Sequence, residues 1–106
     1  MVLKNFLPAS KKTVNSILER LCDLQKILLR SEFFRQHEIV GSSLLIIYDN
    51  QKAGVWMIDF AKSLPLQHPT RIDHVSQWSY GNHEDGYLFG INNLISILKE
   101  HRDNIV

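Results

Sequence analysis

Two apolar runs joined by a short polar segment constrain the fold of this chain most. Residues 38–49 and 55–60 are rich in β-branched and aromatic side chains, and the polar segment between them ends at Gly54. Two such runs predict an antiparallel hairpin. A lone hairpin is only marginally stable in water. The two strands must therefore pack on other elements of the chain or belong to a larger sheet.

Two helical patterns flank the hairpin and can give it that support. Apolar residues recur at three- and four-residue spacing over residues 14–30 and again over residues 87–98. Thr13 is a candidate N-cap for the first helix, and Asn82 or Asp85 for the second. We expect the apolar stripe of the second helix to pack in the core. The predicted fold class is α+β, a small antiparallel sheet packed against flanking helices.

Length, charge and cysteine content limit the function classes. The chain has 106 residues, which is one domain at most, and its net charge is +1. So small a charge argues against a nucleic-acid partner bound through bulk electrostatics. The single cysteine, Cys22, excludes an intramolecular disulfide, and no apolar stretch approaches the ~18 residues of a membrane span. We therefore expect a cytoplasmic protein.

The segment after the hairpin is predicted to be a long loop. Residues 64–80 have no clear period and include two prolines. His68, His74 and His83 lie in or near this segment, but their spacing matches no common metal-ligand pattern. We expect all three to be solvated loop histidines. We expect Cys22 to be a buried or half-buried helix residue.

Asp59 carries the clearest chemical signal. It stands near the end of an otherwise apolar strand, where an unpaired buried carboxylate would be costly. An aspartate at this position can simply cap a turn, and that interpretation stays open. The Ile-Asp-Phe sequence also resembles the Asp-Phe-Gly element of protein kinases, whose carboxylate holds Mg²⁺ on the phosphates of ATP. Lys62 lies three residues further on, within reach of a phosphate cluster.

The expected position of Ser43 depends on the register of the hairpin. If the loop spans residues 49–53, Tyr48 pairs with Gly54 and Ser43 lies directly opposite Asp59. A shorter loop would shift this register. We predict that Ser43 supports Asp59 at a metal site.

Three segments, in this order, resemble the inositol polyphosphate kinase family. They are Gly-Ser-Ser-Leu-Leu at residues 41–45, Val-Trp-Met-Ile-Asp-Phe-Ala-Lys at 55–62, and Gly-Asn-His-Glu-Asp-Gly-Tyr-Leu-Phe-Gly-Ile-Asn-Asn-Leu at 81–94. The resemblance covers roughly residues 17–99. It is strongest to the inositol 1,4,5-trisphosphate 3-kinase branch, because other branches more usually have histidine where Lys62 stands. Ala61 departs from the glycine common in that branch.

The resemblance implies an enzyme that transfers the γ-phosphate of ATP to a hydroxyl of an inositol phosphate, with ATP and Mg²⁺ as cofactors. Asp59 matches the catalytic residue that binds Mg²⁺ and the nucleotide phosphates. Lys62 matches a residue that contacts a substrate phosphate, and Ser43 matches a serine near the metal. Residues 1–106 would then form the C-terminal part of the catalytic domain.

Several parts of the family's active site are absent from the sequence. The Pro-x-x-x-Asp-x-Lys-x-Gly motif does not occur, and residues 52–54 match only its tail. The N-terminal lobe with its ATP-binding lysine is missing too, as is most of the helical inositol-binding insert. We therefore expect this chain alone to have no appreciable kinase activity. Regulation by calmodulin would require a further segment upstream.

Two origins of the chain stay open. It can be the end of a longer kinase, seen through an incomplete gene model, or a short product that acts as a non-catalytic binding or interaction module. In the second case an exposed sheet edge and an unpaired apolar face predict self-association or poor solubility.

Overall fold

A computed structural model describes residues 7–40, 42–49, 51–58 and 63–105. Its elements are, in chain order, α1 (Lys11–Arg30), α2 (Glu32–Arg35), β1 (His37–Glu38), β2 (Ser43–Tyr48), β3 (Ala53–Ile58), β4 (Leu64–Pro65) and α3 (Tyr87–Asp103). β2 pairs with β3 and β1 pairs with β4, both antiparallel. The predicted α+β class, with a small antiparallel sheet on flanking helices, is confirmed. No helix in the described ranges is long and apolar enough to cross a membrane.

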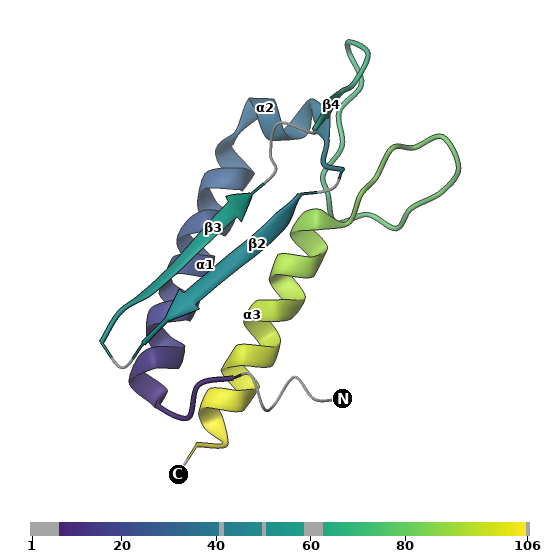
Figure 1. The fold of residues 1–106 in the computed structure, drawn as a ribbon. Helices are drawn as coiled ribbons and strands as arrows, with labels where there is room; N and C mark the ends of the chain where they lie inside the picture. The colour runs from purple at the N-terminus through teal and green to yellow at the C-terminus, as the bar shows by residue number, and fades with distance from the viewer. Residues whose placement is uncertain (1–6, 41, 50, 59–62, 106) are drawn as a thin grey trace.

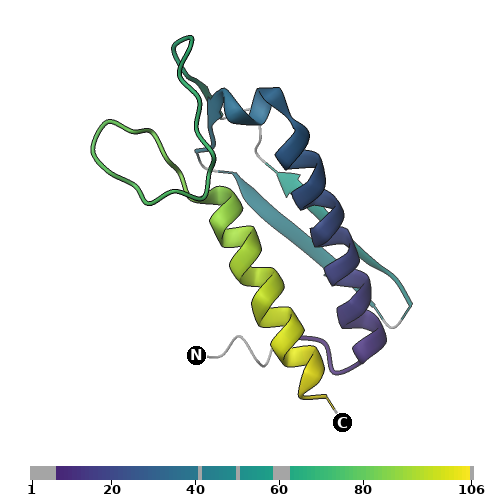
Figure 2. The same cartoon turned by 180° about the vertical axis from the view of Figure 1, so that it is seen from behind.

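The elements form two layers. Figure 1 shows the β2–β3 hairpin in front of α1 and α3, and Figure 2 shows the two helices side by side from behind. The apolar stripes of both helices are buried, as the periodicity predicts, and the inward side chains of the hairpin pack on them. The most deeply buried members of this core are Val14, Ile17, Leu21, Phe34, Ile91 and Leu98.

The helix boundaries are set by capping groups. α1 begins at Lys11 because Ser10, rather than the predicted Thr13, is the N-cap, and Thr13 is itself buried. The Ser10 hydroxyl accepts the Thr13 N–H at 3.5 Å. α3 follows Gly86, whose φ of 69° lies in the left-handed region that glycine tolerates best. Asp85, one of the two predicted caps, accepts the first N–H of this helix, that of Tyr87, at 2.9 Å.

The hairpin loop is one residue shorter than the predicted loop. Tyr48 pairs with Ala53 rather than with Gly54. The carboxylate of Asp49 explains the shorter turn, because it accepts the N–H groups of Gln51 and Lys52, each at 2.7 Å. Such aspartate turns satisfy the backbone locally and close the chain early.

The shorter loop moves Ser43 to the outward face of the hairpin. Ser43 pairs with Ile58, so its predicted position directly opposite Asp59 is wrong. Asp59 itself lies outside the described residues. Ser43 is exposed, and it shares the outward face with four large apolar side chains that are 39–55% exposed, Leu45, Ile47, Trp56 and Ile58.

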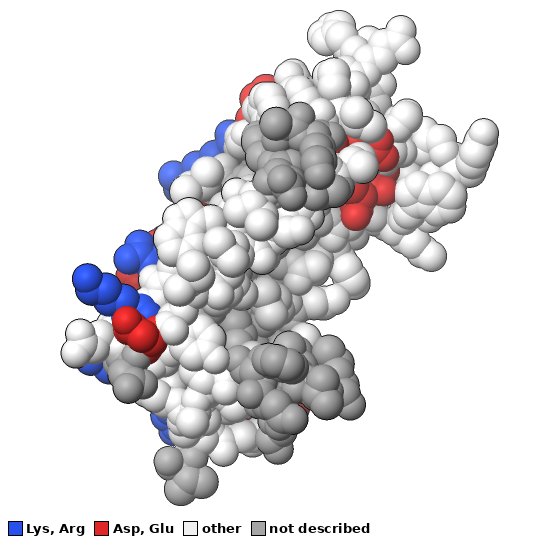
Figure 3. Space-filling view, viewed as in Figure 1, with Lys and Arg blue, Asp and Glu red and all other residues white. Residues whose placement is uncertain are grey.

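This outward face is apolar and is not covered by any described element. Figure 3 looks onto it and shows a mostly uncharged surface over β2 and β3, with Lys and Arg gathered at the α1 edge. The indole of Trp56 lies over Gly54, where an added Cβ would come within 2.1 Å of the ring. Glycine at this position therefore leaves the space that the ring occupies.

Candidate functional site

The predicted site residues are only partly within the described structure. Asp59 and Lys62 lie outside the described residues, whereas Ser43 is exposed at the start of β2. The hydroxyl that reaches the last residue of β3 belongs to the neighbouring Ser42, which donates to the Ile58 carbonyl at 2.8 Å. Sequence reasoning missed Ser42 because it assigned the hairpin a loop one residue too long.

Two strands bracket the segment 59–62. β3 ends directly before it, and β4 begins shortly after it at Leu64. Leu64 pairs with Glu38 of β1, and the Leu66 N–H donates to the Gln36 carbonyl at 2.8 Å. Residues 32–39, which we call the α2–β1 corner, therefore set where the chain re-enters the described fold after this segment.

A pocket of about 330 Å³ opens beside this corner. His37, His68 and Arg71 contribute to its lining, so its character is neutral to basic. The Arg71 guanidinium, however, lies 2.7 Å from the Glu32 carboxylate. The Arg71 cation is thus already paired with a carboxylate of the same chain.

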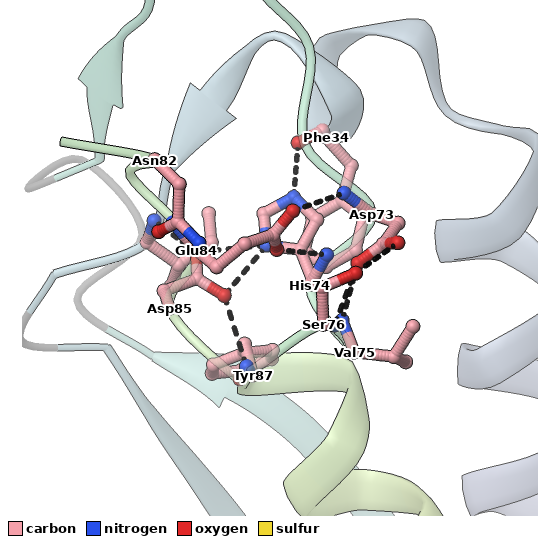
Figure 4. A network of polar contacts seen from close by, with 10 residues as sticks. Phe34, Asp73, His74, Val75, Ser76, Asn82, Glu84, Asp85 and Tyr87 are labelled. Atoms are coloured by element: carbon pink, nitrogen blue, oxygen red, sulfur yellow. Dashed lines mark hydrogen bonds and ion pairs between the residues drawn. The ribbon is translucent and has the colours of Figure 1, made fainter. Parts of the chain in front are cut away.

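His74 lies at the centre of a buried polar network (Figure 4). Its side chain is fully buried, and its ring stacks on that of Phe34 with 3.6 Å between the ring centroids. Nδ1 lies 2.7 Å from Oδ1 of Asp85, and Nε2 lies 2.5 Å from the Phe34 carbonyl oxygen. The prediction of a solvated loop histidine is wrong for His74, because the loop folds back over α2. His68 and His83 are exposed, as predicted.

Asp85 joins three separate segments of the chain. Besides facing His74, it accepts the Ile39 N–H at 2.7 Å and the Tyr87 N–H at 2.9 Å. Burial alone would raise the pKa of Asp85, but the hydrogen bonds from His74 and from these two N–H groups outweigh burial and lower it. Asp85 is therefore an ionised carboxylate at neutral pH.

Glu84 and Asp73 order the loop around His74. The buried Glu84 carboxylate accepts the N–H groups of Asp73 and His74, at 3.2 and 2.9 Å. Asp73 accepts the Ser76 hydroxyl at 2.6 Å and the N–H groups of Val75 and Ser76. The hydroxyl contributes most, and together these donors lower the pKa of Asp73 to about 2. The loop is thus held by charge-assisted hydrogen bonds.

These shifts predict a loss of stability in acid. The pKa values of Asp73 and Asp85 are lower in the folded chain than their ordinary value of 3.8. The contribution of each is therefore complete above that value. The contribution of Asp73 is lost as the pH falls through about 2, and that of Asp85 as the pH falls through its own lowered pKa. We expect the urea midpoint to fall steadily between roughly pH 5 and pH 2. Asp73→Asn should make this fall shallower, and Ser76→Ala should do so partly. An unchanged pH dependence in Asp73→Asn would show that Asp73 does not contribute to the loss of stability in acid.

No group of three or more histidine, cysteine or acidic side chains within the described ranges is arranged to hold a metal ion. The predicted ligand of Mg²⁺, Asp59, lies outside those ranges.

Comparison with known proteins places the chain in a family. Residues 1–99 match the family model for inositol polyphosphate kinase. The chain is 51% identical over 84 residues to the inositol-trisphosphate 3-kinase homolog of Caenorhabditis elegans, and 46% identical over 98 residues to human inositol-trisphosphate 3-kinase A. These alignments cover 79% and 92% of this chain, but only 17% and 21% of the relatives. The chain thus spans about a fifth of the length of these relatives. Because the family model matches nearly its whole length, the chain belongs to the inositol polyphosphate kinase family.

Proposed function

We propose that this chain is the C-terminal part of a catalytic domain that transfers the γ-phosphate of ATP to a hydroxyl of an inositol phosphate, with inositol 1,4,5-trisphosphate as the favoured substrate. The observation that carries the proposal is the similarity to inositol-trisphosphate 3-kinases over 92% of the chain, including the segment with Asp59 and Lys62. The single cysteine fits a reducing compartment such as the cytoplasm.

The residue types of this segment suit phosphoryl transfer. In the proposal, Asp59 holds Mg²⁺ on the phosphates of ATP, because Mg²⁺ prefers hard oxygen ligands. Lys62 contacts a phosphate of the inositol substrate. Together the ion and the ammonium group would offset negative charge at the reacting phosphates. Ser43 remains a candidate for a residue near the metal, now from the outward face of the hairpin.

A chimera tests the proposal. The aligned residues of this chain replace the matching segment of human inositol-trisphosphate 3-kinase A, and phosphorylation of inositol 1,4,5-trisphosphate is measured with labelled ATP. We expect a rate within about tenfold of the human enzyme, a difference of ~1.4 kcal/mol in transition-state stabilisation. The human enzyme with this segment deleted and the 106-residue chain alone are both expected to show only background.

The chimera also separates the proposal from its alternative. Thermal unfolding first establishes that the chimera is folded. A folded chimera with no phosphorylation above background would contradict the kinase proposal. It would favour a non-catalytic interaction module, for which the uncovered apolar face of the hairpin is the specific observation.

A further inference from the structure

Both ring nitrogens of His74 face groups that can only accept hydrogen bonds. The Phe34 carbonyl, 2.5 Å from Nε2, has no proton to give. Asp85 accepts an N–H group at each of its oxygens, from Tyr87 and from Ile39, which fits an ionised carboxylate. A neutral imidazole has one N–H and would leave its other nitrogen lone pair against an acceptor. With Asp85 ionised, only the doubly protonated ring satisfies both contacts.

We propose that His74 is held as a buried imidazolium, and that its second proton locks the loop of residues 73–86 onto the α2–β1 corner. The lock joins Phe34 at the end of α2, Ile39 after β1 and Tyr87 at the start of α3 through one side-chain pair. His74 is thus a positioning residue.

The surroundings of His74 offset the cost of burying its charge. A buried cation requires a partner, and here the Asp85 carboxylate lies 2.7 Å from Nδ1 of the ring. The buried Glu84 carboxylate accepts the backbone N–H of His74 and adds a second negative charge to the network. The face of the Phe34 ring, stacked on the imidazolium, adds a favourable cation–π contact. The remaining titratable and charged groups on the adjoining described elements are Glu32, Arg35, His37, Glu38, Arg71, Asp73, His83 and Tyr87. Glu32 pairs with Arg71 at 2.7 Å and with Arg35 at 3.4 Å, and Glu38 lies 3.9 Å from His83.

The lock extends to β4, which follows the segment that carries Asp59 and Lys62 in the sequence. The α2–β1 corner accepts the Leu66 N–H at Gln36 and the Ile72 N–H at Arg35, at 2.8 and 2.9 Å. Loss of the second proton would leave a buried acceptor without its donor and loosen these contacts. The corner would then hold β4, the strand that follows this segment, less firmly. This consequence for the segment rests on the proposed function, whereas the protonation state of His74 does not.

Nitrogen NMR of the unmodified 106-residue chain tests the protonation state. The histidine ring shifts are recorded from pH 5 to pH 9 on ¹⁵N-labelled protein, and His68→Gln serves as the control variant because His68 is exposed. We expect both ring nitrogens of His74 to keep imidazolium shifts at pH 8, where a histidine with the ordinary pKa of ~6.5 is neutral. A neutral ring at pH 8 would overturn the inference and leave the kinase proposal untouched.

Asp85→Asn tests the pairing itself. An amide can donate to Nδ1, so His74 should become neutral and keep only the Nε2 proton towards Phe34. Amide exchange at Leu66 and Ile72 should become at least about tenfold faster, because the α2–β1 corner opens more easily without the second proton. A tenfold change corresponds to ~1.4 kcal/mol in the free energy of local opening. Exchange at Asp49, whose N–H bonds to Lys52 in the distant hairpin turn, should stay unchanged.

Two results of the Asp85→Asn experiment would count against the lock. An imidazolium retained in the variant would show that Asp85 does not hold the second proton. Equal acceleration at all three amides, Asp49 included, would show a global loss of stability rather than release of the corner. An inactive chimera would contradict the kinase proposal only. The ring shifts of His74 and the amide exchange rates would still test the lock.

Discussion

Asp59→Asn in the active chimera is expected to lower the rate of inositol 1,4,5-trisphosphate phosphorylation about a thousandfold, the upper range for removal of one charge-stabilising group from an active site. Asparagine keeps the size of the side chain but loses the negative charge that attracts Mg²⁺. The loss should fall mainly on kcat, because the metal acts on charge that develops during transfer. Initial rates at saturating ATP and Mg²⁺ measure it.

Asp49→Asn is the matched control for this substitution. Asp49 also follows a strand of the hairpin, but its carboxylate closes a turn through the N–H groups of Gln51 and Lys52. We expect its effect on the rate to stay within about threefold, as for a local turn contact. If Asp59→Asn kept more than a tenth of the activity, Asp59 would be a turn-capping residue and not a metal ligand.

Phe34→Ala is expected to lower the free energy of unfolding by about 3–5 kcal/mol, the usual cost of deleting a buried aromatic ring. The Phe34 side chain is 2% exposed, stacks on His74 and meets the Tyr87 ring edge-on at 6.3 Å. Its loss removes packing in the core and the face on which the buried imidazole rests. For a domain with a typical stability of ~5–15 kcal/mol this is a large share. Urea unfolding at pH 7 measures the change.

Phe33→Ala is the matched control one residue away. Its ring is 45% exposed and stacks on His37 with 3.7 Å between the centroids. We expect a cost below about 1 kcal/mol, because little surface is uncovered. Equal costs for the two variants would contradict the view that α2 is fixed through the buried ring.

The main elements could be predicted from periodicity, but their ends could not. Apolar spacing identified α1 and α3 because each helix buries a single face against the other. The start of α1 depends on the hydroxyl of Ser10, and the hairpin register depends on the carboxylate of Asp49. Each of these is one short side chain among several that could cap or turn the chain. The sequence alone did not show which of these side chains would do so, and the predicted register of Ser43 was wrong for that reason.

The buried network could not be read from the sequence, because its members meet only in the fold. His74 and Phe34 are 40 residues apart, and the residues around His74 mix polar and apolar types without a regular period, as in a solvated loop. The one available signal was the adjacent acidic pair Glu84 and Asp85 before α3. It predicted a cap and gave no indication of a distant histidine. Asp59 and Lys62 could be singled out because they lie in one contiguous sequence motif, and their roles stay predictions.

The outward face of the hairpin bears on how freely this sequence can vary. Leu45, Ile47 and Trp56 do not support the described core, so a chain that works alone would tolerate polar residues there and would gain solubility from them. In a chain that continues into a larger domain, selection would keep the same positions apolar because a neighbouring layer packs on them. The pattern of natural substitutions at these three positions would therefore reveal which kind of protein evolution has preserved.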